Sequence, residues 1–223
     1  MTSAKQTQNL ADKTFATLCS AIITGEIKAG SKISEPELSA QLHVSRASLR
    51  EAIGRLEACK LVTRKANIGA RVVSLSQQSL LEIYQIREAL EGMAARQAAE
   101  NASHEEITQL HQLLEHHNKE TKKINGARYF QHTGDLDFHY HVVQCSHNQH
   151  LINLLGKDLY HLMRMYRYQF GSVSQRVAPA LEEHSYVIHA IQAGDGELAE
   201  LLMRNHIRRS RDNIITLISE PLS

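Results

Sequence analysis

Residues 34–73 carry the most restrictive pattern in the sequence, two short helices followed directly by two short strands. Ser34 and Glu37 form a capping-box pattern, which predicts the start of the first of these helices. Ser45 is the expected N-cap of the next helix, which runs to about Ala58 with an apolar stripe along one side.

The neighbouring segments complete this pattern. Apolar spacing predicts a helix over residues 10–24, ending at Gly25, and short strands at residues 61–63 and 70–73 with a turn between them. Three helices and a hairpin in this order indicate a winged helix-turn-helix. In that fold one helix braces a second, whose first residues reach base edges in the major groove of DNA.

The charge distribution agrees with a nucleic-acid-binding segment. Residues 1–75 contain 11 Lys+Arg against 6 Asp+Glu, a net charge of +5, whereas residues 76–223 contain 14 against 18, a net charge of −4. Three arginines of the second short helix lie off its apolar stripe: Arg46, Arg50 and Arg55. We therefore expect DNA binding. A winged helix that contacts only other proteins remains the alternative.

Composition favours a mainly α fold. Gly 11, Pro 3, Trp 0 and 5% aromatic residues are few for an all-β chain of 223 residues. We expect a soluble cytoplasmic protein, because no run approaches the length of a membrane span and the N-terminus lacks a signal-peptide core. The three cysteines are odd in number and far apart in the sequence, which predicts reduced, partly buried thiols.

The rest of the chain reads as helices separated by turn residues. Together they predict an antiparallel bundle of about six helices in a second domain, residues 76–223, following a first domain of residues 1–75. The predicted helices span residues 77–99, 104–125, 127–145, 149–171, 175–193 and 196–218.

One of these helices carries two carboxylate–imidazole pairs. Asp135 and His139 are four residues apart and share a helix face, as do Asp137 and His141, but only one pair can point into a bundle. Such a pair can hold a metal ion when neighbouring helices supply further ligands, and the later helices offer His184 and His206. Spacing alone leaves both pairs open, as well as an ordinary hydrogen bond without metal.

The first part of the chain resembles a known family through motifs that occur together, in order and at the expected spacing. They are a glycine turn, a Ser-Arg-x-x-x-Arg-Glu-Ala helix and a wing glycine, found in the stretches 25–35, 44–53, 55–57, 61–62 and 69–72. These features closely resemble the GntR family of bacterial transcription regulators. Ser48 and Lys60 depart from the family pattern, standing where many members carry proline and glycine.

This resemblance implies roles for particular residues. Arg46 and Arg50 are the implied base readers, and arginine suits that role because it contacts guanine O6 and N7 together. Ser45 is an implied phosphate contact, and Gly69 the wing tip near the minor groove. The predicted DNA-binding residues are Ser45, Arg46, Ser48, Arg50, Arg55, Gly69 and Arg71.

The second part is similar to the FadR C-terminal (FCD) effector domain, through residues 86–91, 135–139, 148, 184 and 199–206. In metal-binding members, an aspartate and three histidines at these motif positions hold a divalent ion inside the bundle. The resemblance selects Asp135, His139, His184 and His206 as metal ligands. Zinc or nickel suits so imidazole-rich a site.

The resemblance also implies that an effector carboxylate binds beside the metal. Arg87, Tyr140 and Asn148 are the candidate contacts for it. Arg87 falls in an otherwise apolar stripe, where an inward guanidinium needs an anionic partner. The alternative is a surface arginine paired with Glu91, four residues on.

We therefore expect a homodimeric repressor of a metabolic operon that binds operator DNA and responds to a small organic acid. A metal-dependent hydrolase with a DNA-binding appendage is one alternative. An interaction bundle without a ligand is the other. We do not expect catalysis, because no H-E-x-x-H pattern is present.

Overall fold

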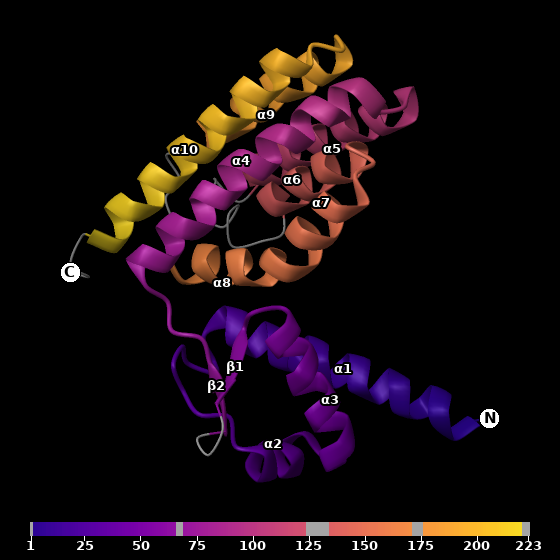
Figure 1. Ribbon diagram of the computed structural model, residues 1–223, viewed down its shortest axis with the longest axis vertical. Helices are drawn as coiled ribbons and strands as arrows, with labels where there is room; N and C mark the ends of the chain where they lie inside the picture. Colours follow the sequence, from indigo (N-terminus) through magenta and orange to yellow (C-terminus); the bar gives the residue numbers. More distant parts are fainter. Residues whose placement is uncertain (1, 66–68, 124–133, 171–175, 220–223) are drawn as a thin grey trace. The chain divides into compact units, whose positions relative to one another are not determined.

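The computed structural model describes residues 2–65, 69–123, 134–170 and 176–219, which form helices and one two-stranded antiparallel sheet (Figure 1). The predicted fold class, a winged helix followed by a helical bundle, is confirmed. The elements are α1 (Thr2–Thr24), α2 (Glu35–Leu42), α3 (Arg46–Ala58), β1 (Val62–Lys65), β2 (Gly69–Val72), α4 (Gln77–Asn101), α5 (His104–Lys123), α6 (Gly134–Cys145), α7 (Gln149–Asn153), a π-helical segment (Leu154–Leu159), α8 (Tyr160–Phe170), α9 (Val177–Gln192) and α10 (Gly196–Ser219).

Packing divides the chain into two compact units. The first consists of Met1–Leu75 together with Asp158–Gln169, and the second of Ser76–Lys157 and Phe170–Ser223. The sequence places a boundary near residue 75 but gives no indication that the later segment packs with the first unit.

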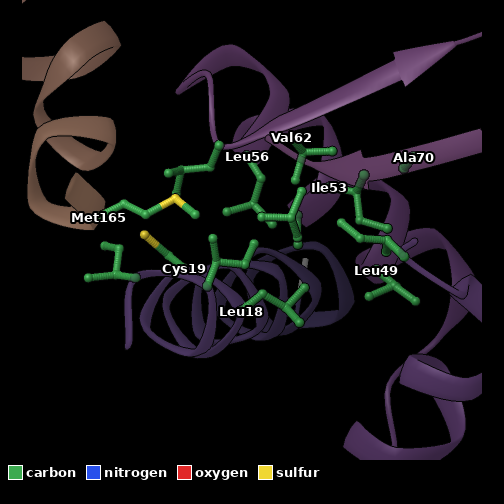
Figure 2. Close-up of a cluster of buried hydrophobic side chains, with 14 residues drawn as sticks. Leu18, Cys19, Leu49, Ile53, Leu56, Val62, Ala70 and Met165 are labelled. Atoms are coloured by element: carbon green, nitrogen blue, oxygen red, sulfur yellow. The ribbon is translucent and has the colours of Figure 1, made fainter. Parts of the chain in front are cut away.

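The first unit has an aliphatic core between α1 and α3 (Figure 2). Leu18 and Ile22 of α1 and Leu49, Ile53 and Leu56 of α3 are buried there at helical spacing. Apolar burial therefore fixes the position of α3, the predicted recognition helix.

The wing is a short hairpin of β1 and β2. Val62 pairs with Val72, and both are buried, whereas Thr63 and its partner Arg71 are exposed. This alternation is the ordinary two-residue period of a strand with one covered face. The Ile33 amide also donates to the Ala70 carbonyl at 2.9 Å, which fastens the segment before α2 to the sheet.

The helix ends in this unit partly match the sequence predictions. The Ser45 side chain accepts a hydrogen bond from the Ser48 amide at 3.1 Å, as expected of an N-cap. The predicted capping box at α2 is wrong, because Ser34 makes no side-chain cap bond although the helix begins beside it. Lys60 adopts φ +60° without being glycine, and the Leu61 amide bonds to the Leu56 carbonyl, closing α3.

Helix α8 completes the core of the first unit. Met165 is fully buried in the aliphatic cluster (Figure 2), and Gln169 Nε2 donates to the Ile22 carbonyl at 3.3 Å. His161 Nδ1 lies 3.4 Å from Sγ of Cys19, a buried free thiol whose pKa is raised by burial to about 11. A helix from the middle of the predicted bundle thus packs against α1.

The second unit is an all-helical bundle in which α4 lies beside α10 and also packs against α6 and α9 (Figure 1). The contacts Glu88–Arg208 and Arg96–Glu200 show that α4 and α10 run antiparallel. Between these contacts the helices approach closely at Gly92, where a Cβ atom would lie 2.7 Å from Cγ of Arg204. The predicted antiparallel arrangement of these two helices is confirmed.

The remaining helix predictions hold with local changes. The continuous helix expected over residues 149–171 is instead α7, the π-helical segment and α8. The start of the helix expected at residue 127 lies outside the described residues. No helix in the described ranges is long and apolar enough to cross a membrane.

Candidate functional site

Helix α3 presents an exposed basic surface opposite its buried stripe. Ser45, Arg46 and Arg50 are exposed on its first turns, and Gly69, with φ +88°, is exposed at the wing. The carboxylate of Glu35 accepts a hydrogen bond from Arg50 Nε at 2.8 Å, but the Arg50 side chain remains 66% exposed. The fold therefore leaves these four predicted DNA-binding residues at the surface.

Three other predicted DNA-binding residues make contacts within the unit. Ser48 is buried, and its hydroxyl lies 3.0 Å from that of Ser45, so its side chain does not face solvent. Arg55 pairs with Asp12 at 2.6 Å. Arg71 donates to the Gly30 carbonyl at 3.0 Å. Ser48 is thus placed to support the helix start, while Arg55 and Arg71 are tied to neighbouring segments.

The bundle gathers three histidines at its centre. His139 of α6, His184 of α9 and His206 of α10 are all buried, and one ring nitrogen of each lies within 4.8 Å of the others. His206 Nε2 is 3.2 Å from His139 Nε2 and 3.3 Å from His184 Nε2. Phe138 stacks on the His184 ring with centroids 3.8 Å apart. Each histidine lies on the buried stripe of its helix, which explains why packing brings them together.

Two glutamates contact this cluster from outside. Glu91 Oε2 lies 2.6 Å from His139 Nδ1, and Glu183 Oε2 accepts from His206 Nδ1 at 2.7 Å. Burial raises the pKa of each carboxyl, but neighbouring arginines and hydrogen bonds from histidines outweigh this effect. Arg87 and His139 lower the pKa of Glu91, and bonds from His206, Arg209 and Arg176 lower that of Glu183 to about 2.

Arg87 combines the two alternatives left open by the sequence. Its side chain is 2% exposed and points into the bundle, yet it also pairs with Glu91 through Nε at 2.5 Å and Nη2 at 3.2 Å. Its Nη1 is buried without a hydrogen-bond partner, as is the hydroxyl of fully buried Tyr84. One edge of this guanidinium is therefore still able to donate.

The other predicted bundle residues lie apart from the three histidines or beyond what the structure describes. Asp135 falls within α6, but its side chain lies outside the described residues. His141 is turned to its own helix, with Nδ1 2.7 Å from the Asp137 carbonyl. Tyr140 is 40% exposed. Asn148 caps α7 by accepting from the His150 and Leu151 amides. The structure thus brings together three of the four predicted metal ligands.

The sequence reasoning missed Glu183 and Arg176 altogether and considered Glu91 only as a surface partner of Arg87. Arg176 precedes α9, is nearly buried and donates to Glu183, while two of its nitrogens have no partner. Glu183 adjoins His184 in the sequence, but it contacts His206 on another helix. The only sequence signal for these residues was that charged side chains fall at positions on helices where the apolar pattern predicts a buried residue.

Both parts of the chain match known protein families. Residues 10–72 match the bacterial regulatory proteins of the gntR family, and residues 82–209 match the FCD domain. A probable D-xylose utilization operon transcriptional repressor of Paenarthrobacter nicotinovorans is 32% identical over 83% of this chain and 80% of its own. The chain belongs to the GntR family of bacterial regulatory proteins. The resemblance seen in its motifs is thereby confirmed.

Other relatives of this GntR protein are also named as transcription regulators. The Nta operon transcriptional regulator of Aminobacter aminovorans is 28% identical, over 88% of this chain and 90% of its own. The gluconate operon transcriptional repressor of Bacillus licheniformis is 29% identical, over 79% and 73%. Among solved structures, E. coli McbR/YncC superimposes with a TM-score of 0.76 at 21% identity, covering 94% of this chain and 99% of that one. The chain is therefore a ligand-responsive DNA-binding transcription regulator.

Proposed function

We propose that this protein is a homodimeric repressor of a metabolic operon, which senses a small organic acid through a divalent metal ion in its bundle. One observation carries the proposal: three buried imidazoles converge at the centre of an FCD domain. The relatives named for xylose and gluconate operons support a role in carbon metabolism. We place its action in the cytoplasm, where operator DNA is found.

The metal would be held by His139, His184 and His206, with Asp135 as the proposed fourth ligand. The donor set fits, because the Nε2 atoms of His139 and His184 both lie within hydrogen-bond distance of His206 Nε2. Nitrogen donors suit zinc or nickel better than magnesium. When bound, such an ion would supply a positively charged Lewis acid that attracts a carboxylate.

Arg87 is the proposed anchor for the acid. Its Nη1 is buried and has no hydrogen-bond partner, so an effector carboxylate would satisfy it at little further desolvation cost. Tyr140 and Asn148 remain predictions as effector contacts, since one is largely exposed and the other caps α7. An acid with a carboxylate at one end and a metal-binding oxygen nearby matches this arrangement best.

In the winged-helix unit, α3 would enter the major groove with Arg46 and Arg50 as base readers. Ser45 would contact a phosphate, and Gly69 would carry the wing toward the minor groove. A two-fold dimer would present two such helices to a pseudo-palindromic operator. Exposed apolar side chains on two adjacent bundle helices support a dimer interface there: Ile86 and Met93 on α4, Leu198 and Leu201 on α10.

The test is fluorescence anisotropy on DNA from the region upstream of the protein's own gene, against scrambled DNA of equal length. Salt is held fixed, because phosphate contacts alone give sequence-independent binding. We expect preferential binding that one acid of a panel reverses only when metal is present. Arg46→Ala should remove the preference, and His139→Ala the metal dependence.

Equal binding to both DNAs, unchanged by any acid, would contradict the proposal. The same panel, followed for turnover by chromatography, tests the hydrolase alternative, for which we expect each acid to be recovered intact. Reciprocity adds a check, since an acid that weakens DNA binding must itself bind more weakly when operator DNA is present.

A further inference from the structure

The two glutamates that contact the histidine cluster determine which nitrogen of each ring carries a proton. Glu91 lies behind His139 and Glu183 behind His206, each at the Nδ1 side. An ionised carboxylate only accepts hydrogen bonds, so His206 Nδ1 must be the donor in its bond to Glu183. At His139 the Glu91 carboxylate makes a close contact with Nδ1 at 2.6 Å, which favours a proton on Nδ1 there too. The Nε2 atom of each neutral ring is then an unprotonated lone pair that faces the centre of the cluster.

This arrangement removes the hydrogen bond that His139 and His206 could otherwise make to each other. His139 Nε2 and His206 Nε2 are 3.2 Å apart, and with both Nδ1 atoms protonated neither Nε2 can donate to the other. A divalent ion, by contrast, can accept a lone pair from both. If the carboxylates were absent, one ring could instead protonate Nε2 and donate to its neighbour, which would satisfy the pair without metal.

We propose that Glu91 and Glu183 are positioning residues of the metal centre, which hold His139 and His206 in the tautomer whose Nε2 binds the ion. This inference rests on the proposed metal site and names residues outside its ligand set. The hydrogen bond made by the second nitrogen of a metal-binding histidine orients the ring and raises its basicity.

Arginines in turn hold the two carboxylates in place. Arg87 donates to Glu91 from two nitrogens, and Glu183 receives bonds from Arg176 and, at 2.7 Å, from Arg209 Nη1. His139 and His206 are thus each backed by a carboxylate, and each of these carboxylates is held by a guanidinium. The glutamates lie on α4 and α9, whereas the histidines that they contact lie on α6 and α10, so the contacts join four helices around one point.

Neutral substitutions test the inference, with controls on the same helices. Glu91→Gln and Glu183→Gln keep the side-chain size but remove the charge and allow the amide to donate to Nδ1. Glu88→Gln on α4 and Glu182→Gln on α9 are the matched controls, because Glu88 pairs with Arg208 and Glu182 bonds to Tyr186 rather than to a histidine. Affinity for Zn²⁺ alone is measured by competition with a chromophoric chelator.

We expect each of the first two variants to bind Zn²⁺ roughly 10–100-fold more weakly than the wild type, and the controls to bind as the wild type does. The visible spectrum of the Co²⁺-loaded protein should change in the same two variants, since it reports the ligand geometry and not general stability. Unchanged affinity in both would overturn the inference while leaving the metal site intact. A wild-type protein that binds no metal would overturn both proposals.

A second measurement uses the metal-free wild type, so its result cannot be caused by a substitution that unfolds the protein. Long-range proton–nitrogen NMR spectra distinguish the two histidine tautomers. We expect His139 and His206 to be protonated at Nδ1 and unprotonated at Nε2, in contrast to the Nε2–H form that predominates in unconstrained neutral histidine. The Nε2–H form at both residues would overturn the inference whatever the metal affinities are.

Discussion

The winged-helix core and the centre of the bundle are built from opposite kinds of side chain. The first is centred on an aliphatic cluster, although its unit also buries Arg167 of α8, whereas the second buries Arg87, Glu91 and three histidines at one place. Aliphatic burial favours folding directly, but buried ions are stabilising only when their partners are in place. The comparison indicates that the stability of the first unit depends mainly on apolar burial, whereas that of the bundle centre depends on keeping charged partners together.

The largest effect should come from separating the buried ion pair. Arg87→Met leaves Glu91 buried without its guanidinium and should destabilise the bundle by about 3–5 kcal/mol. The double variant Arg87→Met with Glu91→Leu removes both charges and should be as stable as the wild type or more so, while losing metal affinity. Urea denaturation followed by circular dichroism measures the stability of the single and the double variant. A double variant that is no more stable than the single one would break the comparison.

The stability of the aliphatic core should fall when a buried apolar side chain is shortened and a cavity is left. Met165→Ala removes a fully buried side chain from the first unit and should cost about 2–5 kcal/mol there, with the bundle unaffected. Hydrogen exchange of α1 and α3, measured by mass spectrometry, should accelerate, while that of α4 and α10 stays the same. Met93→Ala, at a 45% exposed position of α4, is the control. Equal acceleration in both units would contradict the expectation.

Metal should stabilise one unit and not the other. Zn²⁺ at a hundred times its dissociation constant should stabilise the bundle by about 2.7 kcal/mol through mass action. Differential scanning calorimetry with and without a chelator measures this shift. His184→Ala should abolish it without changing the transition of the winged-helix unit. A shift that persists in this variant would place the ion elsewhere.

The smallest expected effect concerns two serines at helix starts. Ser45→Ala removes the side-chain bond to the Ser48 amide and should cost about 1 kcal/mol of stability in the first unit. Ser34→Ala should cost nothing measurable, because Ser34 makes no cap bond. Thermal melts of the two variants compare a serine that makes a cap hydrogen bond with one that does not. Equal losses would mean that the cap geometry of α3 does not hold in solution.

Much of the fold was predictable from local patterns in the sequence. The winged helix followed from the cap at Ser45, the apolar spacing of α3 and the alternation in the two strands. The bundle helices followed from turn residues between apolar stripes. These features depend on interactions between residues that are close in the sequence, so local sequence patterns are enough to predict them.

The site was predictable only in part. The DxxxH spacing left two registers, and the family resemblance selected His139 over His141, in agreement with the convergence seen in the structure. Glu91 and Glu183 contact histidines on other helices, so their placement depends on how whole helices cross, which spacing along one helix does not encode. The same holds for α8, whose apolar face gave no indication that it would meet α1 rather than another bundle helix.

The burial of Met165 at the edge of the aliphatic cluster, beside Cys19, has a practical consequence for dissecting this regulator (Figure 2). A fragment that ends at residue 75 would contain every predicted DNA contact but would leave an apolar hole beside Cys19 exposed to water. Such a fragment would tend to aggregate, and its weak DNA binding would be mistaken for a property of the operator. Fusing residues 158–169 to it through a flexible linker would supply the missing wall and yield a minimal DNA reader free of the sensor.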